Sequence, residues 1–349
     1  MTKYVILEIA NTHGGNKRIL KKTINALANI KYEKLGIKLQ PFNADTIAMS
    51  DFKGYKVYKE LFFSNTEWKN IITTAKSYCD VWLDIFDTYS VSILKQNIKN
   101  ISGIKLQSSI LENEEVLSSI KLLDTTSLEV IINISGLEVS QFEKCLNLEV
   151  WKNFSKIIVQ IGFQDYPTDI ENTGLQKIAV LKALFGHLDI CLADHVDAKS
   201  EFAIQVPVWG ALLGCNYLEK HFCISRAEAK YDSFSSLEPN EVNKFLKNLN
   251  VLQKATTGPF INSREKEYLD STIQIPILKS NIKKGSLLSS SDFIYRRTSM
   301  EGLRREEISK IQNSRQILKK NLVANHAIKE NIFHRARIGV IIACRMKSS

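Results

Sequence analysis

Short apolar runs alternate with longer amphipathic segments through the first 250 residues of the chain. The run at 4–9 has the pattern of a strand, and apolar positions at helical spacing follow it at 19–30. Further strand-like runs lie at 35–40, 81–86, 103–107, 128–134, 157–161, 188–192 and 217–222. Strands that alternate with helices predict a parallel sheet with crossover helices. About eight strands in a segment of this length are typical of a closed (β/α)₈ TIM barrel.

A doubly wound open sheet is the alternative arrangement for such a pattern. Nucleotide-binding sheets of that kind carry a Gly-rich loop directly after the first strand. Here the residues that follow the first run read NTHGG at 11–15, which is neither a dinucleotide-binding nor a P-loop signature. The pattern therefore favours the barrel.

The pattern changes after residue 254. Residues 255–259 read as a break, 263–268 read as a charged connector, and short β-like pieces dominate from there onward. A weak sequence similarity between 282–288 and 327–333 suggests an internal repeat with two related turns. We therefore predict four parts: a barrel domain at 1–255, a linker at 256–270, a small β-rich domain at 271–337 and a tail at 338–349.

Composition places the chain among ordinary soluble globular proteins, with 44% hydrophobic and 24% charged residues. The sequence contains no apolar run near the roughly 18 residues that a membrane span needs. The first residues lead directly into a strand pattern without the features of a signal peptide. These observations predict a cytoplasmic protein with no membrane partner.

The net charge of +10 raises the question of a nucleic-acid partner. The Lys and Arg residues are spread along the chain, densest toward the C-terminus, without a recognisable nucleic-acid motif. An anionic small substrate or a solvated surface accounts for the charge equally well. No nucleic-acid partner is predicted.

Polar side chains recur where the predicted strands end, which is where a TIM barrel carries its chemistry. Lys38 and Gln40 are two positions apart on one strand, so both point to the same side. Each strand-end residue alone has an ordinary structural interpretation, such as a hydrogen-bonded histidine or a lysine at a sheet edge. Two histidines from separate strands can hold a divalent ion, and converging lysines attract an anion. The strand-end residues are Glu8, Lys38, Gln40, Lys105, Asp194, His195, Glu219 and His221.

These strings resemble the N-acetylneuraminate (sialic acid) synthase family. The matching segments are LEIANTH at 7–13, KLQ at 38–40, KLQS at 105–108, YPT at 166–168, ADHV at 193–196 and EKHF at 219–222. Asp232 and the SSLEP string at 235–239 resemble a further family segment. In the small domain, NIKKG at 281–285 and RRTSMEG at 296–302 resemble the antifreeze-like SAF module. The shared order of these motifs covers both domains.

The resemblance implies a condensation of phosphoenolpyruvate with an N-acetylated amino-sugar aldehyde, such as N-acetylmannosamine or a related hexosamine. The product would be a nonulosonic acid, and phosphate would be released. The cofactor would be a divalent metal, with Mn²⁺ expected first and Mg²⁺ or Co²⁺ as alternatives. The family also implies a domain-swapped homodimer, in which the SAF module covers the barrel of the partner.

The resemblance further implies roles for single residues. His195 and His221 would bind the metal, supported by Asp194 and Glu219 behind them. Lys38 and Lys105 would bind the carboxylate and the phosphate. The remaining roles fall to Gln40, which would orient the carboxylate, to Glu8, which would position sugar or water, and to the substrate-binding residues Ser108, Tyr166, Asp232 and Arg297.

Several positions depart from the family pattern. Asp84 stands where a phosphate-binding threonine is expected, and Ala193 replaces a serine before the Asp-His pair. A carboxylate repels phosphate unless it is protonated or paired with a lysine. Two interpretations follow: an active relative with an altered sugar, or a divergent paralogue that binds a sugar or regulates a partner. A carbohydrate-binding protein without chemistry and an unrelated metal-dependent aldolase are further alternatives, and no residue fixes the identity of the sugar.

Overall fold

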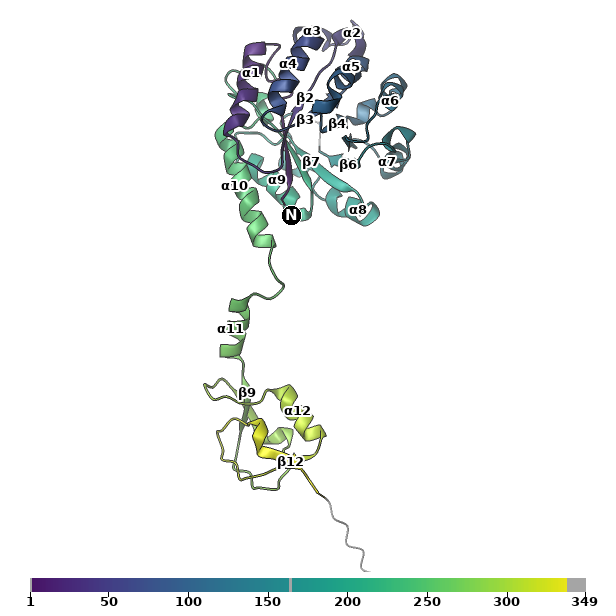
Figure 1. Ribbon diagram of the computed structural model, residues 1–349. Helices are drawn as coiled ribbons and strands as arrows, with labels where there is room; N and C mark the ends of the chain where they lie inside the picture. The colour runs from purple at the N-terminus through teal and green to yellow at the C-terminus, as the bar shows by residue number, and fades with distance from the viewer. Residues whose placement is uncertain (1, 163–164, 338–349) are drawn as a thin grey trace, which may run out of the picture. The chain divides into compact units, whose positions relative to one another are not determined.

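The computed structural model describes residues 2–162 and 165–337 of the 349-residue chain (Figure 1). The chain divides into two compact units, of which the first ends at Thr257 and the second begins at Gly258. The predicted tail at 338–349 lies outside the described residues. Within the described part of the chain, no helix combines the length and apolar character that a membrane crossing requires.

The first unit is built around eight parallel strands that close into a barrel in sequence order. Each of the eight apolar runs in the sequence forms one of these strands, so the predicted (β/α)₈ barrel is confirmed. The strands are β1 (Tyr4–Glu8), β2 (Leu35–Leu39), β3 (Asp80–Ile85), β4 (Gly103–Leu106), β5 (Glu129–Asn133), β6 (Lys156–Ile161), β7 (Asp189–Asp194) and β8 (Tyr217–His221).

Helices follow the strands and surround the barrel (Figure 1). The start of α4 shows how the sequence sets such a helix: Ser64 and Glu67 form a capping box, and Trp68 begins the buried face. The helices of this unit are α1 (Lys17–Ala26), α2 (Ala44–Ile47), α3 (Tyr55–Glu60), α4 (Asn65–Lys76), α5 (Thr88–Asn97), α6 (Glu114–Lys121), α7 (Val139–Leu146), α8 (Lys177–Leu184), α9 (Phe202–Leu213) and α10 (Pro239–Thr256).

The strands present two different faces because side chains alternate along a strand. Apart from Asp194 and Lys220, which pair with each other, the outward face of the strands is apolar and joins the main hydrophobic core with the surrounding helices. A second, smaller cluster fills the inside of the barrel toward the amino ends of the strands. Its members are Ile6, Trp82, Ile131, Ile158, Cys191 and Tyr217, with Tyr4 packed against them. The next inward position on each strand therefore lies above an apolar floor.

Gly103 makes room for the largest side chain of this floor. A Cβ atom added to Gly103 would lie 2.3 Å from a carbon of the buried Trp82 ring. We expect Gly103→Ala to lower the free energy of unfolding by about 1–3 kcal/mol, because overpacking forces ring or backbone to shift. Urea titration followed by circular dichroism measures this change. In a Trp82→Phe background the cost of Gly103→Ala should shrink, and an equal cost in both backgrounds would contradict the steric explanation.

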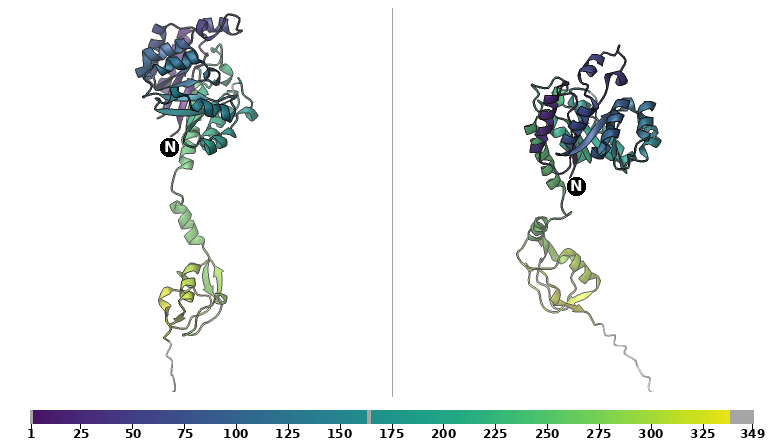
Figure 2. Two further views of the ribbon diagram at one scale, coloured as in Figure 1. Left: turned by 90° about the vertical axis from the view of Figure 1, so that its right-hand side faces the viewer. Right: turned by 45° about the horizontal axis from the view of Figure 1, so that its top comes forward.

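The second unit is small and rich in short strands (Figure 2). Two antiparallel pairs form it, β9 (Ile275–Leu278) with β10 (Phe293–Arg296) and β11 (Gln316–Leu318) with β12 (Phe333–Arg335). The helices of this unit are α11 (Ser263–Thr272) and α12 (Arg305–Asn313). The charged connector expected at 263–268 is therefore helical, because Asn262 caps the helix and Glu265 completes a capping box.

The two halves of this unit complete each other's turns. Asn281 Oδ1 accepts the backbone N–H of Ala324 at 2.8 Å, and Asn321 Oδ1 accepts that of Lys284 at 2.8 Å. Gly285 and Asn325 occupy the corresponding left-handed positions, with φ of 82° and 61°. The internal repeat therefore has an offset of 40 residues, so that position 281 corresponds to position 321. The offset suggested by 282–288 and 327–333 is wrong.

Candidate active site

A layer of polar side chains lies inside the barrel above the apolar floor. Each strand contributes one inward position to this layer, and seven of the eight residues there are polar. Because the barrel is closed, these side chains converge on its axis. All seven are buried. The layer consists of Glu8 on β1, Lys38 on β2, Asp84 on β3, Lys105 on β4, Asn133 on β5, Gln160 on β6, Ala193 on β7 and Glu219 on β8.

Two lysines and three carboxylates form a buried ion-pair network in this layer. Lys38 Nζ lies 3.1 Å from Glu8, 3.0 Å from Asp84 and 2.8 Å from Glu219. Lys105 Nζ donates to the other oxygen of Glu219 at 2.8 Å. Buried charges are tolerated only when such partners compensate the loss of water. The lysines predicted to bind an anion thus lie close together, and carboxylates of the protein face them.

Neutral amides complete the network. Gln40 Nε2 donates to Glu8 at 2.6 Å and to Asp84 at 3.1 Å. Asn133 donates to Gln160 at 2.9 Å, and Gln160 in turn donates to Glu219 Oε2 at 3.0 Å. Neither Asn133 nor Gln160 was among the predicted site residues. Because side chains alternate along a strand, counting every second residue along β5 and β6 would have identified both as inward-facing.

Burial and charge shift the protonation of this layer in opposite directions. Burial alone would raise the pKa of Glu8, but the ammonium groups of Lys38 and Lys105 hold this pKa well below its usual range. Burial opposes the charge of Lys105, yet Asp84 and Glu219 raise its pKa well above the ordinary value. Burial raises the pKa of Asp84 to about 6 against the opposing lysines. Glu8 is therefore a stable anion at neutral pH, whereas Asp84 has a pKa of about 6.

Glu8, His195 and His221 form a candidate metal centre. One ligand atom from each residue lies within 4.8 Å of the others, and all three residues are buried. Glu8 Oε2 is 3.3 Å from His221 Nε2. Two imidazoles and an ionised carboxylate suit divalent transition metals such as Mn²⁺, Co²⁺ or Zn²⁺. The two histidines were predicted as ligands, whereas Glu8 was expected to position sugar or water, and its place beside the histidines was not predicted.

Aromatic and hydroxyl groups orient these histidines. The Tyr166 ring lies 4.6 Å from the His195 ring and is stacked 5.5 Å from the His221 ring, measured between centroids. Ser235 Oγ lies 3.5 Å from His221 Nδ1. Contacts of this kind limit rotation of the imidazoles and fix the nitrogen that faces a metal.

A cavity of about 570 Å³ opens above the polar layer. This volume lies in the range of small-molecule sites. Asp232 reaches it from a left-handed backbone position with φ of 53°, and its carboxylate accepts the backbone N–H of Asn11 at 2.9 Å. The predicted substrate-binding residues Ser108, Tyr166 and Asp232 thus line one cavity together with Gln40 and His221.

Two predicted site residues, Asp194 and Glu219, have partners other than those expected, while Arg297 lies in the small unit as predicted. Asp194 faces away from the barrel axis, and its carboxylate binds Lys220 Nζ at 2.5 Å. Glu219, expected behind the metal, instead bridges the two lysines of the polar layer. Arg297 belongs to the second unit, where its Nε donates to the backbone of Thr272 at 2.9 Å. Ala193 contributes only a methyl group to the polar layer, so β7 supplies no donor there.

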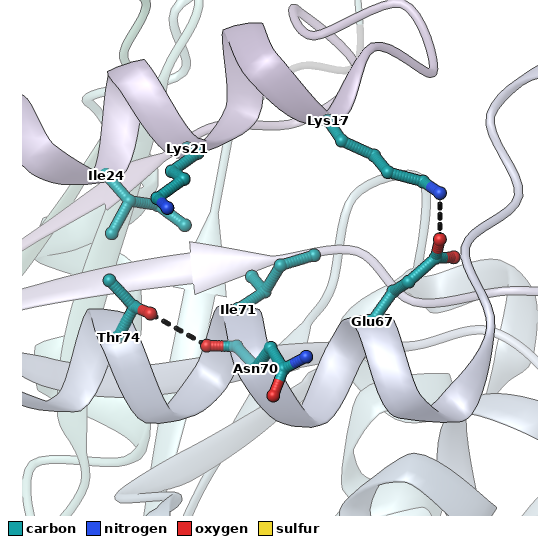
Figure 3. A pocket seen from close by; sticks show the side chains of 7 residues that line it. All are labelled: Lys17, Lys21, Ile24, Glu67, Asn70, Ile71 and Thr74. Carbon is teal, nitrogen blue, oxygen red and sulfur yellow. Dashed lines mark hydrogen bonds and ion pairs between the residues drawn. The ribbon is translucent and has the colours of Figure 1, made fainter.

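A second hollow, of about 210 Å³, lies on the outer helix layer (Figure 3). Side chains of α1 and α4 alone line it, and the ion pair of Lys17 with Glu67 crosses its rim. Thr74 donates to the backbone of Asn70 at 2.8 Å in the same place. The hollow shares no residue with the polar layer or the histidines. The buried cluster inside the barrel is therefore the candidate active site.

The fold and this cluster define a class of protein: a TIM barrel whose strand ends carry a candidate metal-binding set beside a buried lysine pair. The chain belongs to the NeuB family, whose sequence profile matches residues 31–259. The predicted relation to the sialic acid synthases is thereby confirmed at the level of the family. The assignment of the second unit as an SAF module stays a prediction.

Individual relatives agree with this placement. The N,N'-diacetyllegionaminic acid synthase of Campylobacter jejuni is 24% identical over 312 residues, which cover 84% of this chain and 90% of that protein. A Chromobacterium violaceum structure, provisionally called spore coat polysaccharide biosynthesis protein E, has a TM-score of 0.80 and 20% identity, covering 95% of this chain and 99% of that one. The N-acetylneuraminic acid synthetase of Leptospira borgpetersenii has a TM-score of 0.66 and 20% identity, covering 78% and 92%. The two structures support the fold alone.

Proposed function

We propose that this protein condenses phosphoenolpyruvate with an N-acetylated amino-sugar aldehyde, giving a nonulosonic acid and phosphate. One observation carries the proposal: a single carboxylate joins the metal-binding set to the lysine pair. Glu8 lies 3.3 Å from His221 through one oxygen and 3.1 Å from Lys38 through the other. A carbonyl beside the Glu8, His195 and His221 set and an anion held by the lysines would therefore be neighbours, as a condensation between them requires.

In this proposal, positively charged residues bind the anionic substrate, and the carboxylate and imidazole groups hold a metal ion. Lys38 and Lys105 bind the carboxylate and phosphate of phosphoenolpyruvate, and Gln40 orients the carboxylate. A divalent ion held by Glu8, His195 and His221, with Mn²⁺ as first choice and Mg²⁺ or Co²⁺ as alternatives, would supply a Lewis acid for the aldehyde oxygen. Burial strengthens these interactions because water does not screen them.

The reaction forms one carbon–carbon bond and breaks one carbon–oxygen bond. The methylene carbon of phosphoenolpyruvate attacks the aldehyde carbon, and water adds to the carbon that bears the phosphate. Phosphate then leaves with cleavage of its bond to that carbon. Ser108, Tyr166 and Asp232, which line the cavity, contact the sugar in this proposal.

The proposal includes an assembly. The second unit acts as an SAF module that covers the barrel of a partner subunit in a domain-swapped homodimer, and Arg297 reaches the sugar bound there. The protein works in the cytoplasm on small precursors of surface polysaccharides or other glycans. The family relationship and the motifs at 281–285 and 296–302 support this part.

A second candidate function is binding of a sugar or a regulatory partner without catalysis. The specific observation in its favour is the ion pair between Asp84 and Lys38, at 3.0 Å, in which a carboxylate of the protein takes the place of an anionic ligand. Ala193 offers no hydrogen-bond donor in place of a hydroxyl. Each lost donor to a charged group can weaken binding by about 1.5–3 kcal/mol.

Phosphate release separates the two functions. Metal-loaded protein is incubated with phosphoenolpyruvate and a panel of N-acetylated hexosamines, with a no-sugar control. We expect phosphate release that depends on one or more of the sugars, because the proposed cleavage follows carbon–carbon bond formation. Release that is absent with every sugar, together with no phosphoenolpyruvate binding by calorimetry, would favour the non-catalytic function.

A further inference from the structure

Asp84 is a member of the polar layer whose hydrogen bonding is incomplete. Its side chain is fully buried on β3. Oδ2 lies 3.0 Å from Lys38 Nζ and accepts from Gln40 at 3.1 Å. Oδ1 has no hydrogen-bond partner among the described residues, although no solvent reaches it. A buried acceptor without a donor is costly, so this oxygen is a natural place for a proton or a ligand.

Charged groups on four other strands influence the protonation of Asp84. Lys38 on β2 and Lys105 on β4 favour its ionised form, while Glu8 on β1 and Glu219 on β8 oppose it. Asp84 also lies 3.0 Å from Lys38, the lysine that the proposed function assigns to the anion. Burial adds to the two carboxylates and raises the pKa of Asp84 to about 6. An ionised Asp84 would repel an anion bound beside Lys38, unless this carboxylate took up a proton.

We propose that Asp84 binds the anionic substrate in its protonated form, donating its Oδ1–H to a substrate oxygen. The proton comes from solvent when the anion enters, and no other bond is made or broken. Uptake converts a repelling group into a hydrogen-bond donor. The identity of the anion as phosphoenolpyruvate rests on the proposed function. Asp84 thereby becomes a residue that determines how tightly, and at which pH, the barrel accepts its anion.

The sign of the pH dependence follows from linkage. The bound complex holds a proton that the free protein releases as pH rises through the pKa of Asp84. Binding is therefore tightest at low pH and weakens above that pKa, by up to about tenfold for each pH unit. The phosphate of the substrate has its second pKa near 6 and is fully ionised at about pH 8. A proton taken up at about pH 8 therefore belongs to the protein.

Titration calorimetry of the metal-loaded full-length protein with phosphoenolpyruvate, without sugar, tests this proposal. Measurements at about pH 6.5 and about pH 8, each in two buffers of different ionisation heat, give both the Kd and the number of protons taken up. The wild-type protein should take up close to one proton at the higher pH, and its Kd should rise by more than tenfold between the two. Asp84→Asn keeps the shape of the protonated acid, so it should take up no proton at about pH 8 and show a much smaller change in Kd.

Asp189→Asn is the matched control. Asp189 pairs with Lys156 at 3.1 Å at the opposite end of the barrel, and its replacement should leave the proton count of the wild type unchanged. Phosphoenolpyruvate binding by the wild type without proton uptake would overturn the role of Asp84 and leave the proposed function standing. Uptake that persists in Asp84→Asn would overturn it too. Absence of binding by the wild type at both pH values would overturn both proposals. The wild-type proton count decides the question even if Asp84→Asn fails to fold.

Discussion

Replacing His221 by alanine is expected to remove the bound divalent ion and to abolish turnover. His221 supplies one of only three ligand atoms that converge within 4.8 Å, counted over the described residues. Its loss leaves two ligands, His195 and Glu8, and Glu8 also loses its 3.3 Å contact with His221. A Lewis acid contributes several kcal/mol of charge stabilisation. With tenfold in rate for each 1.4 kcal/mol or so, turnover should fall by about a thousandfold or more.

Metal content measured by mass spectrometry after dialysis is the direct readout, with phosphate release as the second. His187→Ala serves as the control because His187 is exposed outside the site. This control should keep both its metal and its activity. Full metal content in His221→Ala would show that His221 is not a ligand, whatever happened to turnover.

Lys38→Met should lower the free energy of unfolding of the barrel by about 3–5 kcal/mol at neutral pH. Lys38 is the common partner of Glu8, Asp84 and Glu219, all within 3.1 Å. Removing it leaves three buried carboxylates with one ammonium group, and breaking a buried ion pair from one side costs this much. The loss should shrink as pH falls, because the unpaired carboxylates then bind protons more readily when folded than when unfolded.

Urea unfolding followed by tryptophan fluorescence measures this effect for the barrel alone. Trp68, Trp82, Trp151 and Trp209 are the four tryptophans of the chain, and all lie in the first unit. Lys76→Met removes a half-exposed lysine that pairs with Asp80 at 3.0 Å, and it should cost at most about 1 kcal/mol. An equal, small change in both variants would mean that the network adds nothing to stability.

The barrel could be predicted from the sequence because its strands are buried on both faces and are separated by amphipathic helices. Strand periodicity also placed Lys38 and Gln40 on one side, where both are found. The same rule puts Asp194 and His195 on opposite faces, since neighbours in an extended strand alternate. The assignment of Asp194 behind the metal followed the family motif instead of this rule, and the structure pairs it with Lys220.

The partners inside the barrel could not be predicted in this way. The stagger between strands decides which side chains reach one level, and a list of inward positions does not fix it. Glu219 therefore lies between Lys38 and Lys105 although the motif suggested a place near His221. Glu8 joins the histidines for the same reason, because β1 closes the barrel against β8 and aligns Glu8 with His221.

The reciprocal asparagines of the second unit have a consequence for how that unit acquires its structure. Asn281 completes a turn 43 residues further on, and Asn321 completes one 37 residues before it. Neither half has a finished turn of its own, so nucleation in one half gains little until the other arrives. The unit should thus behave as a single cooperative element with distant contacts, which form slowly and are lost together.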